Sequence, residues 1–322
     1  MAENYIETIK SIYIRQGLTP PPESKIVPDG KIRRWDEEGK RNGKGNIWLA
    51  VYSTTPLYFR GGDWSIPNSG FKYYGEGVDT SPLTDEEQKA IWEQRKRQRE
   101  EEEEQRKVTL SATREEWKNL PRYSDKNFST PHPYLTKKGL KTAHLARWKE
   151  EGNLLVFPLL NESGEVENLQ KIDIDGQKRF VKGLRKRGLF CPLWNQNSNT
   201  EKIFAVEGFA TGLSVLEATN TLTVVCIDCG NLTEAIRSAT DYFLTSWKLK
   251  ERPESFYKRF TIIADNDTSK AGEEGARKAV TELKCNAVLI PEEGMDANDY
   301  AQAYGVEKLA KILGFNNKEN KI

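Results

Sequence analysis

Four short apolar runs decide the fold: IFAVEG (203–208), TLTVVCID (221–228), RFTIIADND (259–267) and NAVLIP (286–291). Each run is rich in Val, Ile, Leu or Phe, as are strands that are buried on both faces of a parallel sheet. Helical patterns separate the runs, at 213–219, 231–247 and 273–283. Strands that alternate with helices predict a doubly wound α/β unit with a mostly parallel sheet.

Carboxylates follow three of these predicted strands. Glu207 closes the first strand, and Asp265 and Asp267 close the third. Asp296 and Asp299 come shortly after the fourth. An α/β sheet binds its ligands at the carboxyl ends of its strands, and oxygen ligands without histidine suit Mg²⁺ or Mn²⁺. A single acid in a loop is usually structural. Acids at three strand ends together predict a site for phosphodiester chemistry that depends on one of these ions.

The Glu-Gly after one strand and the Asp-x-Asp after a later one resemble the Toprim domain of DnaG-type primases, type IA and II topoisomerases and some nucleases. The resemblance covers residues 203 to about 313 and includes the small residues that open the next helix, Gly272, Gly275 and Ala276. It implies that Glu207 is the metal-associated general acid/base. It also implies that Asp265 and Asp267 hold the metals, with Asp296 and Asp299 as secondary ligands.

One position departs from the pattern of DnaG-type primases. Those proteins usually have an aspartate four residues after the motif glutamate, and this chain has Thr211 there. The stretch GFATGLSVLEAT (208–219) instead resembles the Toprim branch found in primases of conjugative plasmids and satellite phages. Thr211 lies at the start of the predicted helix, where its hydroxyl and the helix N-terminus can hold a phosphate.

A basic segment precedes the α/β unit. Residues 171–187 contain seven bases and two acids, a net charge of +5. Such a stretch is often a solvated loop, but it can also follow a phosphate backbone. Its position, after strands expected at 153–161 and 166–174, resembles the basic antiparallel subdomain of DnaG-type cores, and HPYLTKKGL (132–140) resembles the start of that core. We therefore expect nucleic-acid or nucleotide binding by Lys178, Arg179, Lys182, Arg185, Lys186 and Arg187.

The first 82 residues predict a small α+β unit. A helix is expected at 5–16 and strands at 31–35, 46–53 and 71–75, while the RGG stretch at 60–62 reads as a turn. Three aromatic side chains, Trp35, Trp48 and Trp64, either stack on single-stranded DNA or fill the core of the sheet. The segment that follows, 83–107, is almost entirely charged and predicts a solvated helix with i,i+4 ion pairs.

The expected organisation is therefore α+β N-terminal and basic subdomains followed by an α/β Toprim domain with a Rossmann-like, mostly parallel sheet. The boundaries are 1–82 for the aromatic-rich N-terminal sheet domain, 83–118 for the charged linker helix, 119–200 for the basic primase-core subdomain, 201–315 for the Toprim domain and 316–322 for a tail.

Composition excludes several classes of protein. The chain has 322 residues and a net charge of +1, with no run of about 18 apolar residues, so no membrane partner is expected. The N-terminus carries acids and has no unbroken apolar run, so it does not read as a secretory signal, and four cysteines fit a reducing cytoplasm. The resemblance implies that this is the cytoplasm of a bacterial host. Cys226 and Cys229 lack a second pair, so no zinc is expected. No P-loop motif is present, so a helicase would be a separate partner.

The leading hypothesis is a DNA primase of a phage, plasmid or other mobile element. It would bind single-stranded DNA and NTPs and join the NTPs into short primers by metal-dependent nucleotidyl transfer. Two alternatives stay open. One is a Toprim nuclease, which uses similar acids, and the other is a non-catalytic protein that binds single-stranded DNA during replication.

Overall fold

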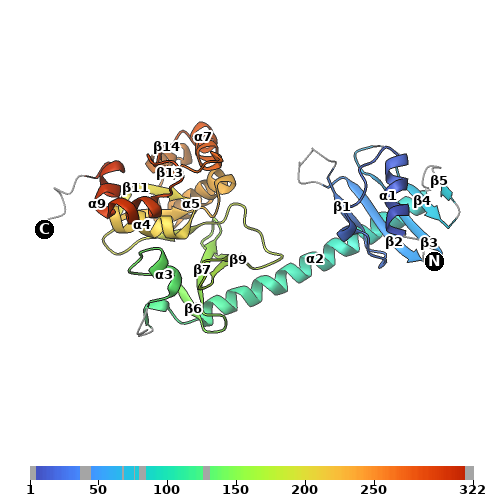
Figure 1. Ribbon diagram of the computed structural model, residues 1–322, viewed down its shortest axis with the longest axis horizontal. Helices are drawn as coiled ribbons and strands as arrows, with labels where there is room; N and C mark the ends of the chain where they lie inside the picture. Colours follow the sequence, from blue (N-terminus) through green and yellow to red (C-terminus); the bar gives the residue numbers. More distant parts are fainter. Residues whose placement is uncertain are drawn as a thin grey trace. The chain divides into compact units, whose positions relative to one another are not determined.

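The computed structural model describes residues 5–36, 45–66, 69–75, 77–79, 85–125 and 131–315. The chain divides into two compact units, residues 1–105 and 106–322. A single long helix, α2 (Asp85–Asn119), begins in the first unit and ends in the second (Figure 1). The expected start of the linker helix at 83–84 and the predicted tail at 316–322 lie outside the described residues.

The first unit is a five-stranded antiparallel meander with one helix, α1 (Tyr5–Arg15), packed on it. Its core joins aliphatic side chains of α1 to aromatic side chains of the sheet. The strands lie in sequence order, β1 (Arg33–Trp35), β2 (Ile47–Thr54), β3 (Leu57–Asp63), β4 (Phe71–Tyr74) and β5 (Gly77–Asp79).

The glycines of this unit are not the turn that the sequence predicted. Gly61 and Gly62 lie inside β3, opposite Leu49 and Trp48 of β2. A Cβ on Gly61 would come within 1.9 Å of the Tyr13 hydroxyl, which donates a hydrogen bond to the carbonyl oxygen of Trp48. Glycine is used here so that α1 can approach the sheet closely.

Helix α2 contacts both units at its ends. In the first unit, the Gln94 amide donates to the carbonyl oxygen of Gly30 and accepts a hydrogen bond of 3.1 Å from the Tyr52 hydroxyl. In the second unit, the Glu116 carboxylate receives the ammonium groups of Lys149 and Lys171, at 2.9 and 2.7 Å. The helix is therefore fixed at both ends by polar contacts.

The second unit opens with a four-stranded antiparallel sheet and the short helix α3 (Pro133–Lys137). The turn at Asp173–Gln177 joins its last two strands and closes with backbone hydrogen bonds between those two residues and from Gly176 to Asp173. The strands, in sequence order, are β6 (Arg147–Lys149), β7 (Leu154–Leu160), β8 (Val166–Ile172) and β9 (Lys178–Phe180).

A five-stranded sheet follows, in the order β10-β12-β11-β13-β14. The last four of these strands run parallel, and β10 pairs antiparallel to β12 at the edge. The strands are β10 (Cys191–Leu193), β11 (Asn199–Val206), β12 (Thr221–Val225), β13 (Phe260–Ala264) and β14 (Asn286–Leu289). The helices are α4 (Phe209–Thr219), α5 (Leu232–Ser246), α6 (Pro253–Phe256), α7 (Ala271–Leu283), α8 (Ala297–Tyr304) and α9 (Val306–Ile312).

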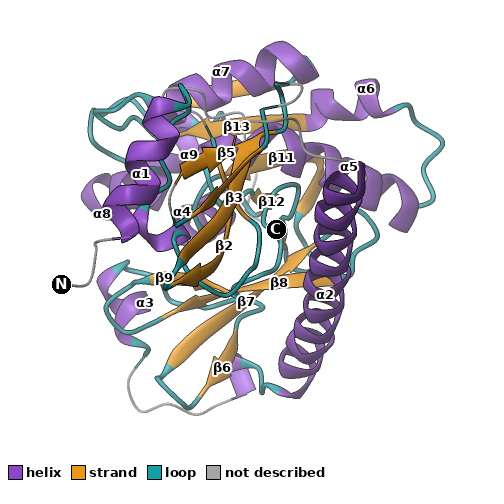
Figure 2. Ribbon diagram, turned by 90° about the vertical axis from the view of Figure 1, so that its right-hand side faces the viewer, coloured by secondary structure: helices purple, strands orange, loops and turns teal. Residues whose placement is uncertain are grey.

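The helices form a layer on each face of this sheet (Figures 1 and 2). Phe204 and Val206 of β11 belong to the core under α4, α8 and α9, while Ile203 and Ala205 belong to the core under α5 and α7. Burial on both faces explains why the strand sequences are continuously apolar. The predicted α/β fold, preceded by α+β regions, is confirmed. Every helix among the described residues is too short or too polar to cross a bilayer.

The antiparallel sheet shares one of these two cores. Leu155, Phe157 and Leu159 of β7 pack in the same cluster as Phe209 and Leu213 of α4. The second unit is therefore one packed body from its antiparallel sheet to its last helix.

Candidate functional site

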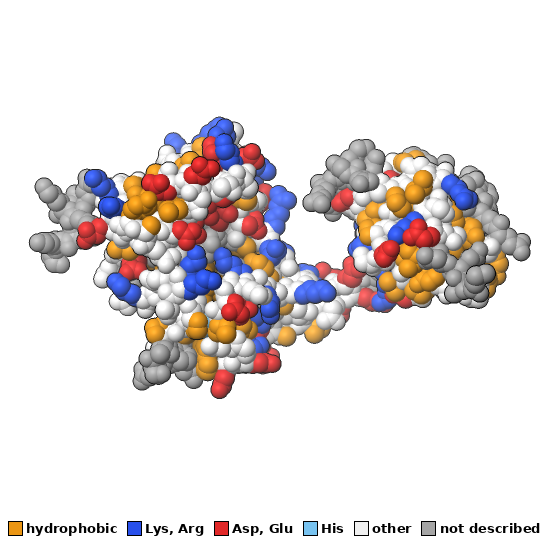
Figure 3. Space-filling model, in the orientation of Figure 1, with side chains coloured by type: hydrophobic (Ala, Val, Ile, Leu, Met, Phe, Trp, Pro, Cys, Tyr) orange, Lys and Arg blue, Asp and Glu red, His pale blue; other side chains and the backbone are white. Residues whose placement is uncertain are grey.

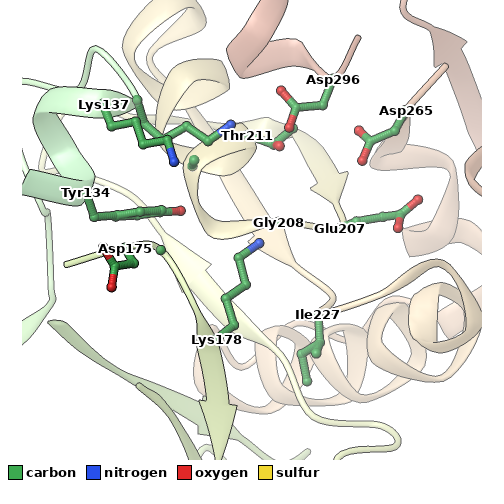
Figure 4. A pocket seen from close by; sticks show the side chains of 13 residues that line it. Tyr134, Lys137, Asp175, Lys178, Glu207, Gly208, Thr211, Ile227, Asp265 and Asp296 are labelled. Carbon is green, nitrogen blue, oxygen red and sulfur yellow. The ribbon is translucent and has the colours of Figure 1, made fainter. Parts of the chain in front are cut away.

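A cavity of about 330 Å³ lies at the carboxyl ends of β11 and β13 (Figure 4). Acids from these strand ends line one side, and lysines from the antiparallel sheet and α3 line the other. The cavity is large enough for a small ligand such as a nucleotide. Its lining residues are Tyr134, Lys137, Lys138, Asp175, Gly176, Lys178, Glu207, Gly208, Ala210, Thr211, Ile227, Asp265 and Asp296.

Glu207 and Asp265 lie side by side because their strands are neighbours, with Ala205 of β11 paired to Ile262 of β13. Glu207 Oε1 and Asp265 Oδ1 are buried and have no hydrogen-bond partner among the described residues. Burial, with the charges of Asp267 and Asp228, raises the pKa of Glu207 to about 7. Burial and the Glu207 charge likewise raise the pKa of Asp265 to about 8. At both carboxylates burial outweighs the opposing charge of Lys178.

Asp267 differs from these two acids because its carboxylate accepts several hydrogen bonds. Its carboxylate accepts hydrogen bonds from the Ser269 hydroxyl at 2.5 Å and from the backbone N–H groups of Ala271 and Gly272 at 3.3 and 3.1 Å. These hydrogen bonds, led by that of Ser269, lower the pKa of Asp267. Asp267 is therefore ionised at neutral pH and holds the N-terminus of α7 beside the other two acids.

Two glycines bring α7 close to the acids. A Cβ on Gly272 would lie 2.6 Å from the Asp265 carbonyl oxygen and 3.1 Å from Glu207 Oε1. A Cβ on Gly275 would lie 2.8 Å from Cys229, in the turn that follows β12. The predicted small residues of this helix thus set the spacing of the acidic cluster.

The two acids that follow β14, Asp296 and Asp299, have different positions relative to the cavity. Asp296 lines the cavity and caps α8, where its side chain accepts a hydrogen bond of 2.8 Å from the Asp299 N–H. Asp299 does not line the cavity and pairs with the Lys138 ammonium at 3.2 Å. Between them, the buried Asn298 amide donates to the Lys138 carbonyl and to the Ser214 hydroxyl. This stretch therefore ties α8 to α3, and Asp299 serves that contact.

The wall opposite the acids is basic. Lys178 of β9 extends toward Gly208, where its Nζ would lie 3.7 Å from a Cβ on that glycine (Figure 4). Much of the Lys178 side chain is exposed, but its ammonium enters the cavity, and burial there lowers the pKa of Lys178 against the opposing pull of Asp296. Lys137 and Lys138 reach the same space from α3. The cavity thus places cationic groups across from carboxylates.

The N-terminus of α4 also borders the cavity. The first N–H groups of a helix have no intrahelical partner, and Gly208, the N-cap, has no side chain that could accept a hydrogen bond from them. Gly208, Ala210 and Thr211 all line the cavity. A helix N-terminus without a side-chain cap attracts an anion through its N–H groups and its dipole.

The rest of the predicted basic segment lies outside the cavity. Arg185 pairs with Glu167 at 2.5 Å, Arg187 with Glu234 at 3.1 Å, and Arg179 lies 3.7 Å from Asp173. Lys182 and Lys186 are exposed, with the Lys186 ammonium 4.8 Å from the centre of the Phe180 ring. Lys and Arg side chains nevertheless gather beside acidic ones on the face of this unit in Figure 3. Partial neutralisation makes the basic segment a weaker anion-binding surface than its sequence charge suggests.

The three predicted stacking tryptophans differ in exposure. Trp35 is 8% exposed and belongs to the core, with its indole N–H bonded to the Thr19 carbonyl. Trp48 is 1% exposed and stacks beneath Trp64, with ring centres 4.8 Å apart. Trp35 and Trp48 are therefore not accessible to bases, and Trp64, at 39% exposed, is the member of the set that reaches the surface.

Sequence reasoning missed two parts of the site. Asp228 follows β12 and its charge acts on Glu207, a position that the strand-end argument would have found had it been applied to TLTVVCID. Tyr134, Lys137 and Lys138 reach the cavity from α3. They come from the HPYLTKKGL stretch, whose distance of about 70 residues from Glu207 hides their proximity.

The residues present fit a divalent cation. Two buried carboxylate oxygens without partners are hard ligands whose charge a cation would neutralise. Among the residues that the structure describes, no group of three or more His, Cys, Asp and Glu side chains closes around one point. Such a partial set is typical of Mg²⁺ sites, which combine one or two carboxylates with waters and substrate phosphates.

Comparison with known proteins identifies the α/β region. Residues 202–307 match the family model of the Toprim domain. Two proteins named "DNA primase TraC" from Escherichia coli are similar in sequence. One is 34% identical over 111 residues, which are 34% of this chain and 8% of that protein. The other is 27% identical over 233 residues, which are 71% of this chain and 21% of that protein. The chain thus spans about a fifth or less of these relatives' length.

Two solved structures are similar at low identity. The Aquifex aeolicus primase, with its zinc-binding and RNA polymerase domains, is 14% identical with a TM-score of 0.42, and the match covers 96% of this chain and 83% of that one. The DnaG catalytic core is 12% identical with a TM-score of 0.35, over 61% and 63% of the two chains. The family match and the sequence relatives confirm the predicted resemblance to Toprim-domain primases.

Proposed function

We propose that this protein is a DNA primase that joins NTPs into short primers on a single-stranded DNA template. The observation that carries the proposal is the cavity in the Toprim domain, where unpartnered carboxylates face lysines and an uncapped helix N-terminus. Nucleotidyl transfer needs both, because a triphosphate must be bound and its developing negative charge must be neutralised. Sequence relatives named as DNA primases support this choice of reaction.

Glu207 and Asp265 would hold the divalent cation, with Asp267 beside them. When bound, Mg²⁺ or Mn²⁺ supplies charge neutralisation for phosphate oxygens. The chain's own groups bind and orient the nucleotide: the Lys178 ammonium and the N–H groups at the start of α4 receive phosphate oxygens. Glu207 is the group proposed to take a proton from the attacking hydroxyl, since its carboxylate is buried at the same edge.

Primer synthesis tests the proposal directly. Wild type and D265N are incubated with single-stranded DNA, labelled NTPs and Mg²⁺ or Mn²⁺, and products are resolved by length. We expect primers from the wild type and a loss of about 10²-fold or more from D265N, as for other groups that stabilise transition-state charge. D241N is the matched control, because Asp241 is an exposed acid on α5 outside the cavity.

Three results would contradict the proposal. Equal incorporation of NTPs by wild type and D265N would show that the Asp265 carboxylate is not needed for synthesis. Degradation of DNA without NTPs would indicate a Toprim nuclease, and metal-independent DNA binding without product in either assay would indicate an accessory protein. The mobile-element setting, the cytoplasmic location and a separate helicase partner stay predictions.

A further inference from the structure

Tyr134 is a buried residue whose hydroxyl oxygen has no hydrogen-bond partner among the described residues. Its side chain is 3% exposed and belongs to the core of the second unit, and its ring packs over Gly176. The hydroxyl is nonetheless buried without a hydrogen-bond partner. A tyrosine whose buried hydroxyl makes no hydrogen bond stabilises the fold less than phenylalanine would at the same position. A bound ligand that accepts a hydrogen bond from this hydroxyl would explain why tyrosine is present.

The hydroxyl faces the phosphate-binding side of the cavity. Figure 4 shows the Tyr134 ring directed from α3 toward Gly208 and Lys178. Three lysines, Lys137, Lys138 and Lys178, and the N-terminus of α4 line the cavity with Tyr134, together with the carboxylates of Asp175 and Asp296. Burial and the charge of Asp296 raise the pKa of Tyr134 to about 12, so the phenol is neutral at pH 7 and can donate.

We propose that the Tyr134 hydroxyl donates a hydrogen bond to a phosphate oxygen of the bound nucleoside triphosphate. This inference rests on the proposed function and adds a binding residue from α3, outside the Toprim domain. Lys178 and the α4 N-terminus supply charge to the triphosphate, and Tyr134 supplies a directional contact. Because the ring is held in the core, the contact requires little ordering of the side chain on binding.

The test measures ligand binding rather than synthesis. Wild type and Y134F are titrated with ATP in the presence of Mg²⁺ and, separately, with inorganic tripolyphosphate, by isothermal titration calorimetry. We expect Y134F to bind both probes about 3- to 10-fold more weakly, the range for one lost hydrogen bond. Its thermal midpoint should equal or exceed that of the wild type, because the substitution removes an unpartnered buried hydroxyl.

T240V is the matched control. Thr240 of α5 is fully buried and also carries a hydroxyl without a partner among the described residues, but it does not line the cavity, and Ala239 and Phe243 of the same helix belong to the other core. Both variants should keep or gain stability, and only Y134F should lose affinity for the two probes.

Each contrary outcome has a distinct meaning. If wild type binds neither probe, the proposed function fails together with this inference. If wild type binds both probes and Y134F binds them equally well, only the role of Tyr134 is overturned. If Y134F loses affinity for ATP but not for tripolyphosphate, the hydroxyl contacts the nucleoside and the phosphate assignment is wrong.

Discussion

Glu207 and Asp265 place two carboxylates side by side, and one oxygen of each has no hydrogen-bond partner among the residues that the structure describes. Burial raises the pKa of both carboxyl groups, and the charge of Glu207 raises the pKa of Asp265 further. The pKa of Asp267 is lowered instead, because its carboxylate accepts hydrogen bonds from the Ser269 hydroxyl and from backbone N–H groups of α7. The site thus combines one carboxylate whose pKa is lowered with two whose pKa values are raised.

Gly272 sets the spacing of this arrangement, and G272A tests it. The new Cβ would lie 2.6 Å from the Asp265 carbonyl oxygen, so either α7 or the Asp265 backbone must shift. A shift of a few tenths of an ångström to 1 Å in a catalytic group costs up to about 10²-fold in rate. We expect G272A to reduce primer synthesis by about 10- to 100-fold while its far-UV circular dichroism spectrum stays native.

G230A provides the comparison. A Cβ on Gly230 would make only an ordinary contact of 3.4 Å with Asp228, and this glycine lies at the same end of the domain. Activity close to wild type is expected for G230A. Equal activity of G272A and wild type would show that the close approach of α7 has no role in catalysis.

At this scale the sequence predicted the strand-end acids but not all of their partners. Glu207, Asp265 and Asp267 could be predicted because the end of a parallel strand is a position that the sequence itself marks. The engagement of Asp299 by Lys138 could not, because the two residues are 161 positions apart and meet only after α3 folds against α8. The burial of Trp35 and Trp48 likewise depends on the packing of the first unit.

Among the elements, helix α2 has charged residues with two different roles. Its middle is a solvated surface, but Glu116 near its end joins Lys149 of β6 and Lys171 of β8. Burial pushes the pKa of Glu116 upward, and the hydrogen bonds from Lys171 and Lys149 outweigh it, so the pKa lies below the usual 4.5. The carboxylate therefore stabilises the folded chain when it is ionised.

E116Q tests this anchor. At pH 7 we expect it to lower the free energy of unfolding of the second unit by about 1 kcal/mol, a modest value because solvent partly screens the pair. Since the folded pKa is depressed, the stabilisation is complete above about 4.5 and is lost as the pH falls through the folded pKa. Urea unfolding at pH 7 and at pH 3 should show the difference between wild type and E116Q shrink at the lower pH.

E151Q is the control for charge alone. Glu151 lies 3.8 Å from the same Lys149 but its side chain is 91% exposed. We expect a change below about 0.5 kcal/mol at either pH. An E116Q effect that is constant from pH 7 to pH 3 would contradict the ionic anchor.

The sequence predicted helices correctly where the hydrophobic pattern was strong. It did not predict the strand in which glycines allow close packing. The helices at 231–247 and 273–283 correspond to α5 and α7 within one or two residues. Strand β3 was missed because Gly61 and Gly62 read as a turn, whereas they make room for Tyr13. A glycine that permits close packing and a glycine that permits a turn look the same in sequence.

For the whole molecule, each of the two units has its own core. Phe59 is fully buried in the core of the first unit, and Phe260 is fully buried in a core of the second. Separate cores predict separate cooperative transitions. We expect calorimetry of the intact chain to show two unfolding transitions.

F59A and F260A assign the two transitions. Removing a buried phenylalanine ring costs about 3–5 kcal/mol. F59A should lower the midpoint of one transition and leave the other in place, and F260A should do the reverse. A single transition that shifts equally in both variants would mean that the units unfold together.

The core that β7 shares with α4 has a consequence for how such a domain can be exchanged between proteins. A Toprim domain is one contiguous stretch of sequence, and a graft that began at residue 201 would carry all of its acids. It would leave Phe209 and Leu213 without Phe157 and its neighbours. The transferable module is therefore larger than the family match: a functional transplant must bring the antiparallel sheet and α3 along, with the junction placed in the solvated middle of α2.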